Sequence, residues 1–148
     1  MEKVNFKIDI DIVTHDSVRE HPFVNISVNG HPKYGEILNK STLVEIDVDL
    51  ADDSDNVLTI EYLNKDPIND VIYDESKILK DKRVEVKKIS INDIEIVYHS
   101  FDNSNTFIYE SLDGKVTHKG FEASKLSWNG RTSLKFRTPI YIWILENI

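Results

Sequence analysis

Four oxygen-bearing side chains in one long polar segment, residues 64–82, are candidates for binding a cation. Calcium takes six to eight oxygen ligands, which carboxylates and carbonyls on a loop can supply. A loop of this length in a compact domain is usually functional or disordered. One hypothesis is a calcium site; the alternative is a solvated loop kept hydrated by its charges. The candidate ligands are Asn64, Asp66, Asp70 and Asp81.

Three aromatic residues in or near this segment are candidates for contacting a ligand. Tyr73 lies within the acidic segment, and Tyr98 and Phe101 lie in the next predicted loop. An aromatic ring combines a flat apolar face with, in tyrosine, a polar tip, so an exposed ring suits carbohydrate binding. The alternative is that each ring plugs a long loop against the core.

Motifs of defined catalytic geometry are missing from the sequence. There is no Gly-x-Ser-x-Gly elbow, no P-loop and no HExxH pair, and the five histidines are scattered. The absence of cysteine excludes thiolate chemistry and disulfides. We therefore expect a binding protein rather than an enzyme.

Charge and hydropathy narrow the range of partners. The net charge is -8, which argues against a general nucleic-acid binder because phosphate contacts need a basic surface. No apolar run is long enough to span a bilayer, and the first residues alternate too early for a secretion signal. We expect a soluble protein that contacts neither nucleic acid nor membrane.

Alternation of apolar and polar residues with period two dominates the first hundred residues. It runs through 6–12, 24–28, 44–50 and 58–62, as in strands with one buried face. The sequence predicts one all-β domain over residues 1–148, an antiparallel sandwich of about eight strands. The predicted core contains Ile8, Ile10, Ile26, Val28, Val44, Ile46, Val48, Leu58, Ile60, Ile89, Ile91, Leu134 and Phe136.

Two turn dipeptides, and one change in the phase of the apolar–polar alternation, add detail to the predicted sandwich. Asn29-Gly30 and Asn129-Gly130 are dipeptides typical of two-residue hairpins. Val84 and Val86 share one phase, but Ile89 and Ile91 are shifted by one residue, which predicts a β-bulge.

The C-terminal segment, residues 139–148, is apolar on two sides. Thr138-Pro139 can start a short helix, although the following residues could equally form a buried strand. In either form two surfaces must cover it. One should be the sandwich, and the other a second layer of the domain or a neighbouring subunit, so an oligomer could form through this segment.

Residues 5–97 resemble the calcium-dependent xylan-binding carbohydrate modules. The resemblance rests on the motifs Leu58–Asp66, Asp81–Val86 and Ile89–Ile94, with an early strand and turn at Phe23–Gly30. It implies a jelly-roll-like sandwich whose loop calcium binds sugar hydroxyls, with Asn64, Asp66 and Asp81 as ligands. The sequence departs from the family at Lys65, Lys82 and Asp93.

The closing stretch, 128–146, looks more like the ending of small proteins encoded by tailed phages, especially marine ones. This resemblance implies a phage protein located in the host cytoplasm or in the phage particle. Two functions follow as expectations: a calcium-assisted module that binds glycan, or a virion structural, decoration or interaction protein that binds another protein.

Overall fold

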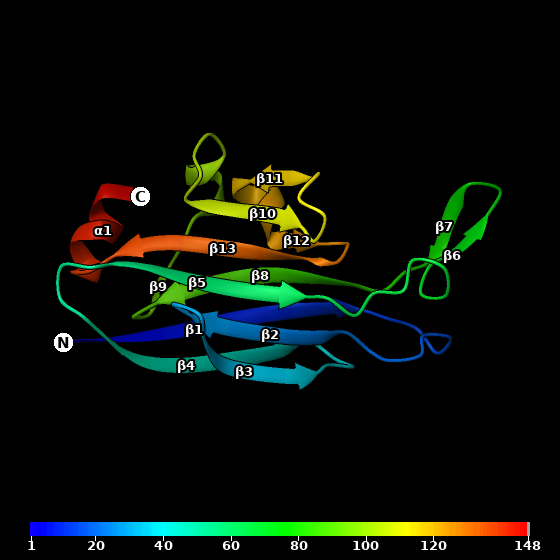
Figure 1. Ribbon diagram of the computed structural model, residues 1–148, viewed down its shortest axis with the longest axis horizontal. Coiled ribbons are helices and arrows are strands. Elements are labelled where there is room, and N and C mark those ends of the chain that lie inside the picture. Colours follow the sequence, from blue (N-terminus) through cyan, green and yellow to red (C-terminus); the bar gives the residue numbers. More distant parts are fainter. Residues whose placement is uncertain (148) are drawn as a thin grey trace.

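The computed structural model describes residues 1–147 and contains two antiparallel sheets packed face to face (Figure 1). Strands β12, β8, β1 and β4 lie side by side in the first sheet, and β9 pairs with β8. Their bounds are β1 (Glu2–Val13), β4 (Thr42–Leu50), β8 (Arg83–Ile91), β9 (Ile94–Glu95) and β12 (Lys125–Leu126).

The second sheet has six strands, in the order β11-β10-β13-β5-β2-β3. Their bounds are β2 (Phe23–Val28), β3 (His31–Ile37), β5 (Asp55–Tyr62), β10 (Phe107–Ser111), β11 (Thr117–Lys119) and β13 (Gly130–Arg137). The predicted antiparallel sandwich is confirmed, although within residues 1–147 its two sheets contain five and six strands rather than about eight in all.

The core lies between the sheets, where the inward side chains of alternating strands meet. Each of the thirteen predicted core residues is buried. Phe6 of β1 and Phe136 of β13 meet across the interface with ring centroids 5.6 Å apart. The period-two pattern therefore identified the buried face of the long strands correctly.

The phase change in β8 is a bulge, as predicted. Asp9 of β1 pairs with Lys88 and Ile10 pairs with Val86, so Lys87 is the extra residue. Asn29 and Gly30 both have positive φ and close the β2–β3 hairpin in the manner of a type I′ turn.

The prediction of a hairpin at Asn129-Gly130 is wrong. The preceding strand, β12, pairs with β8 in the first sheet, whereas β13 pairs with β10 and β5 in the second. The dipeptide thus connects the two sheets. Gly130 is required by a close approach rather than by a turn, because a Cβ atom there would lie 2.5 Å from the Glu110 carbonyl oxygen.

The C-terminal segment is a helix, α1 (Ile140–Asn147), which covers one end of the sandwich (Figure 1). Ile140, Trp143 and Ile144 are buried, and Trp143 lies 6.2 Å from the Phe136 ring. The outer face is exposed, whereas Ile148 lies outside the described residues. Within residues 1–147, no helix has the length and apolar character needed to cross a membrane.

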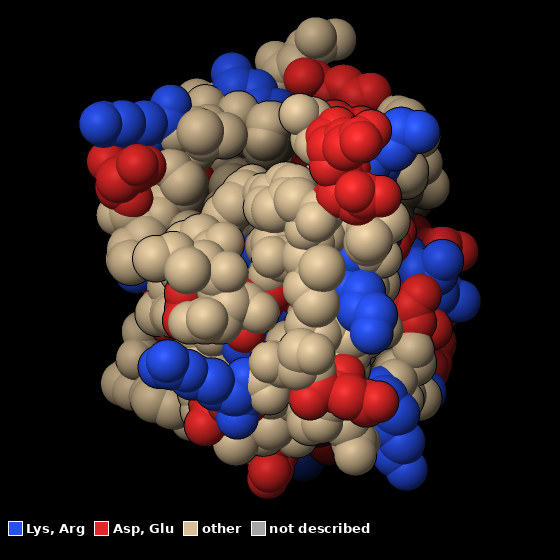
Figure 2. All heavy atoms as spheres, turned by 90° about the vertical axis from the view of Figure 1, so that its right-hand side faces the viewer, with Lys and Arg blue, Asp and Glu red and all other residues tan. Residues whose placement is uncertain are grey.

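Segment 64–82, expected to be irregular, contains a two-stranded hairpin of β6 (Ile72–Asp74) and β7 (Lys77–Lys80). The hairpin projects from the end of the molecule opposite α1 (Figure 1). Figure 2 shows this end, where Lys, Arg, Asp and Glu lie mainly around the margin and other residues fill the centre. Glu75 and Ser76 have positive φ, which closes the hairpin despite the absence of glycine.

Candidate functional site

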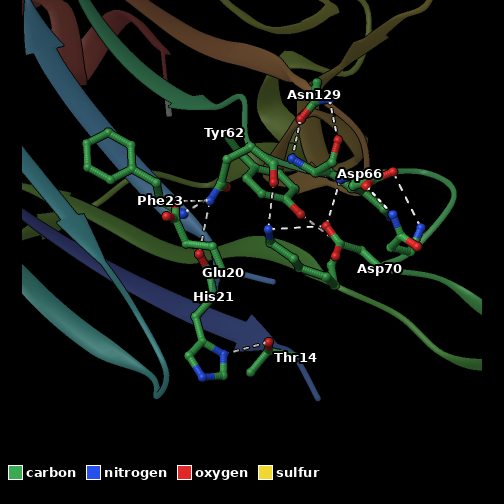
Figure 3. Close-up of polar contacts among 12 residues, drawn as sticks. Thr14, Glu20, His21, Phe23, Tyr62, Asp66, Asp70 and Asn129 are labelled. Carbon is green, nitrogen blue, oxygen red and sulfur yellow. Dashed lines mark hydrogen bonds and ion pairs between the residues drawn. The ribbon is translucent and has the colours of Figure 1, made fainter. Parts of the chain in front are cut away.

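Two of the predicted calcium ligands, Asn64 and Asp66, form hydrogen bonds within the protein, Asn64 with the segment that leads into β2 and Asp66 within its own loop. The Asn64 Oδ1 atom accepts a hydrogen bond from the Phe23 amide at 2.9 Å (Figure 3). The Asp66 carboxylate accepts bonds from the Ile68 amide at 3.0 Å and the Asn69 side chain at 2.6 Å. These bonds lower the pKa of Asp66, with the Asn69 side chain contributing most.

The other two, Asp70 and Asp81, are buried and paired with lysines. The Lys65 Nζ atom lies 2.7 Å from the Asp81 Oδ1 atom, and the Lys82 Nζ atom lies 3.2 Å from the Asp70 Oδ2 atom. Backbone amides complete the shell: Lys82 N donates to Asp81, and Asp66 N donates to Asp70, both at 2.7 Å. We call Lys65, Asp70, Asp81 and Lys82 the buried ion cluster.

The buried ion cluster does not fit a calcium ion. Calcium needs six to eight converging oxygens. Here the Oδ1 atom of Asp81 accepts bonds from the Lys65 ammonium and the Lys82 amide, and the Oδ2 atom of Asp70 accepts from the Asp66 amide and forms an ion pair with Lys82. Only the Asp70 Oδ1 atom is without a hydrogen-bond partner among the buried side-chain atoms of residues 1–147. Two lysines therefore neutralise the carboxylates that were expected to bind metal.

A tyrosine closes the cluster from the core side. The Tyr62 hydroxyl donates to the Lys82 carbonyl at 2.9 Å. Burial raises the pKa of Tyr62 far above its usual value, and the nearby carboxylates of Asp70 and Asp81 raise it further. The phenol is therefore a permanent hydrogen-bond donor at neutral pH.

The predicted aromatic platform at Tyr98 and Phe101 is corrected by the structure. Both residues are in the 3-10 helix η1 (Tyr98–Phe101) and are buried. Tyr98 stacks on Phe107 with centroids 4.7 Å apart, and Phe101 stacks on Trp143. Both rings fill the core and offer no face to a ligand. Tyr73 is exposed on the β6–β7 hairpin, as expected of a ring that could contact a ligand.

A groove of about 570 Å³ lies elsewhere, beside the turn that connects β10 and β11. Trp128 forms its aromatic wall and is 48% exposed. Leu112 and Val116 add exposed apolar surface. Two acidic residues, Asp113 and Glu122, also line it. This combination of an aromatic face, aliphatic flanks and a few polar groups is typical of small-ligand sites.

The groove is assembled from four separate segments. Ser111 ends β10 and the 112–116 turn follows it, His118 belongs to β11, and Glu122 belongs to the 3-10 helix η2 (Gly120–Ser124). The 127–129 segment enters β13 and supplies the tryptophan. The buried Thr132 hydroxyl donates to the Ala123 carbonyl at 2.6 Å, which fixes η2 on β13.

Hydrogen bonds at residues 128 and 129, together with one ammonium group, fix the position of Trp128. The Tyr109 hydroxyl donates to the Trp128 carbonyl at 3.1 Å. Asn129 forms a reciprocal pair with the Lys65 backbone, accepting from its amide at 2.8 Å and donating to its carbonyl at 2.9 Å (Figure 3). The Lys65 Nζ atom lies 4.4 Å from the centroid of the indole. One ring face is therefore covered by an ammonium, as in a cation–π pair.

The charges in the groove are of both signs. The Ser111 hydroxyl, followed by the Lys115 amide, stabilises the Asp113 carboxylate and lowers its pKa. Glu122 lies 3.8 Å from Lys125, an exposed pair of little energetic weight. Asp113 is thus an ionised acceptor at neutral pH, held in one orientation.

Sequence reasoning missed this groove. Its residues have no shared spacing, and Trp128 was adjacent to a dipeptide that was interpreted as a hairpin turn. The signal available in the sequence was a tryptophan followed directly by Asn-Gly, at a point where the alternating strand pattern is weak. Comparisons with protein-family models, curated proteins and solved structures find no match for the chain.

Proposed function

We propose that this protein is a non-catalytic module that binds carbohydrate in the Trp128 groove. The observation that carries the proposal is the half-exposed Trp128 in a groove that is also lined by two acidic residues, Asp113 and Glu122. A pyranose ring presents C–H groups on its faces and hydroxyls on its rim. The indole suits the faces, and ionised carboxylates are strong acceptors for the hydroxyls.

This proposal keeps the glycan ligand that the resemblance implies but moves the site. The resemblance placed the site at the acidic segment, with calcium binding the sugar. In this chain, lysines already neutralise the buried carboxylates of that segment. A site that binds sugar through an aromatic face and hydrogen bonds is therefore favoured over one that uses calcium.

The test is a printed glycan array, xylan among its glycans, followed by isothermal titration with the strongest ligand. Trp128→Ala should weaken binding about tenfold or more, since an aromatic contact contributes about 1 kcal/mol beyond its buried area. The matched control is Tyr73→Ala, which removes an exposed ring that does not line the groove. Binding that depends on Tyr73 and not on Trp128 would refute the groove and return the site to the hairpin.

A second candidate function, an interaction protein of a larger assembly, is favoured by helix α1. Tyr141, Ile142 and Leu145 are 57%, 54% and 72% exposed on its outer face. Two surfaces are expected to cover this apolar segment, and residues 1–147 supply only the sandwich. A contiguous apolar patch of this kind is typical of a protein–protein contact.

The test for this second function is the state of association in solution. Ile142→Lys with Leu145→Lys changes the outer face while leaving the buried Trp143 in place. If the face is an interface, the wild type should sediment as an oligomer, or co-purify with a partner, and the variant should not. A wild type that is monomeric and alone at high concentration would remove this candidate.

A further inference from the structure

One ammonium group connects the buried ion cluster to the groove. The Lys65 Nζ atom donates to the Asp81 carboxylate at 2.7 Å and to the Ser127 carbonyl at 2.5 Å. It also faces the Trp128 ring at 4.4 Å. Its side chain is 1% exposed. The group thus joins the loop that carries Lys65 to a loop 62 residues further along the sequence.

The second lysine of the cluster offers a natural comparison. Lys82 is equally buried and is paired with Asp70. Its Nζ atom donates to the Asn64 carbonyl at 2.6 Å, and within residues 1–147 neither a hydrogen bond nor a cation–π contact joins Lys82 to Trp128. The two lysines therefore share burial and charge pairing, but only Lys65 contacts the segment that supplies the aromatic wall.

We propose that Lys65 is a positioning residue: its buried ammonium, rather than a bound metal ion, joins segment 64–70 to segment 127–129 and orients Trp128 for a ligand. This inference rests on the proposed function for the identity of the ligand. The orientation of the ring is a property of the unliganded protein and is measurable without any ligand.

The physical reason is that an ammonium combines three donors with a full charge in a small volume. Two donors are used by the Asp81 carboxylate and the Ser127 carbonyl. The remaining side of the group faces the negative face of the indole, where desolvation strengthens the attraction. The Asp81 carboxylate pairs with the ammonium, and the ammonium in turn covers one face of the ring. The opposite face is left for the groove.

The experiment compares two double variants designed to stay folded. Lys65→Met with Asp81→Leu and Lys82→Met with Asp70→Leu each replace one buried ion pair by apolar residues, a change that is often neutral for stability. Both are made in a Trp143→Phe background, which leaves Trp128 as the only tryptophan. Acrylamide quenching of its fluorescence then reports how much of the ring is accessible.

We expect faster quenching in the Lys65 double variant and unchanged quenching in the Lys82 double variant. Affinity for the strongest glycan from the array should fall about tenfold in the first and stay unchanged in the second, because a ring that occupies the binding orientation about a tenth of the time lowers the apparent affinity by that fraction. The wild-type melting temperature and affinity should be the same in calcium chloride and in EDTA.

Three results would overturn the inference. Equal effects of the two double variants would mean that any break in the cluster disturbs the ring. Unchanged quenching and affinity in the Lys65 variant would mean that the ammonium does not orient it. A higher wild-type melting temperature in calcium would mean that a metal ion supplies the charge, because binding to the folded state raises stability.

The failure of this inference can be distinguished from failure of the proposed function. If no glycan binds but quenching separates the two variants, carbohydrate binding is refuted and the role of Lys65 in orienting Trp128 stands. If glycan binding requires Trp128 but both variants quench alike, the groove stands and the role of Lys65 is refuted.

Discussion

Replacing Lys65 alone should destabilise the protein strongly. Lys65→Met keeps the aliphatic stem and removes the ammonium from Asp81, whose side chain is only 10% exposed. The chain contains a matched control, since the Lys7 Nζ atom lies at the same distance, 2.7 Å, from an Asp93 oxygen. The control pair is exposed, with side-chain values of 40% and 77%. The two pairs differ mainly in burial.

The size of the effect follows from what remains around Asp81. Removing one partner of a buried ion pair costs about 3–5 kcal/mol, because the other charge stays buried without compensation. Asp81 retains the Lys82 amide at 2.7 Å and the Arg83 guanidinium at 3.6 Å, which places the cost near the lower limit. A cost of about 3 kcal/mol lowers the melting temperature of a domain this size by about 6–12 °C.

The assay is urea unfolding, followed by circular dichroism, with calorimetry as a second measurement. The urea midpoint of Lys65→Met should fall at an unchanged slope, because the surface exposed on unfolding is the same. Lys7→Met should leave the midpoint almost unchanged, since exposed pairs contribute little. Equal small shifts in both variants would refute the reasoning, since burial would then make no difference to the pair.

Three further perturbations test other parts of the structure. Burial raises the pKa of Tyr62 and Tyr98 well above the unfolded value of about 10, so the unfolded state loses these protons first and stability should fall as pH rises above about 10. Absorbance at 295 nm should show that both remain protonated until the protein unfolds; six tyrosinates formed in the folded protein would contradict this. Gly130→Ala should cost about 1–3 kcal/mol in urea unfolding, because the new Cβ atom would meet the backbone carbonyl of Glu110; a cost within error of zero would contradict the close approach. Truncation after Thr138 removes the buried residues of α1 and should give an unfolded or aggregated chain by circular dichroism and light scattering, whereas an unchanged melting temperature would mean that the helix does not close the core.

The strands of the sandwich could be predicted from sequence because their signal is local. In β1, β4 and β5 one buried face alternates with one solvated face, so each strand reveals its orientation without knowledge of its partners. The bulge at Lys87 was visible for the same reason. The hairpin prediction at Asn129-Gly130 failed because the same dipeptide occurs both in tight turns and in other loop contacts. Only the pairing of β12 and β13 with different strands distinguishes the two cases.

The groove could not be predicted because its residues share no local pattern. Trp128, Leu112 and Glu122 come together only when β10, η2 and β13 are in place. Tyr98 and Phe101 illustrate the converse case. Their sequence position after a strand suggested an exposed loop, but a single 3-10 turn directs both rings into the core.

The acidic segment contained a usable signal in its lysines. Residues 64–82 contain five acidic residues and four lysines, so the segment has a net charge of only -1. A calcium loop needs carboxylates whose charge is left for the metal, whereas here almost every acid has a lysine available within the same stretch. Buried carboxylates must be neutralised by some cation. Lys65 and Lys82, each adjacent in sequence to an acid, could supply that charge from within the chain. Comparing the number of lysines with the number of acids in such a segment therefore distinguishes a metal-binding loop from one whose own charges neutralise each other. Here the count agrees with the two lysine–aspartate pairs of the buried ion cluster.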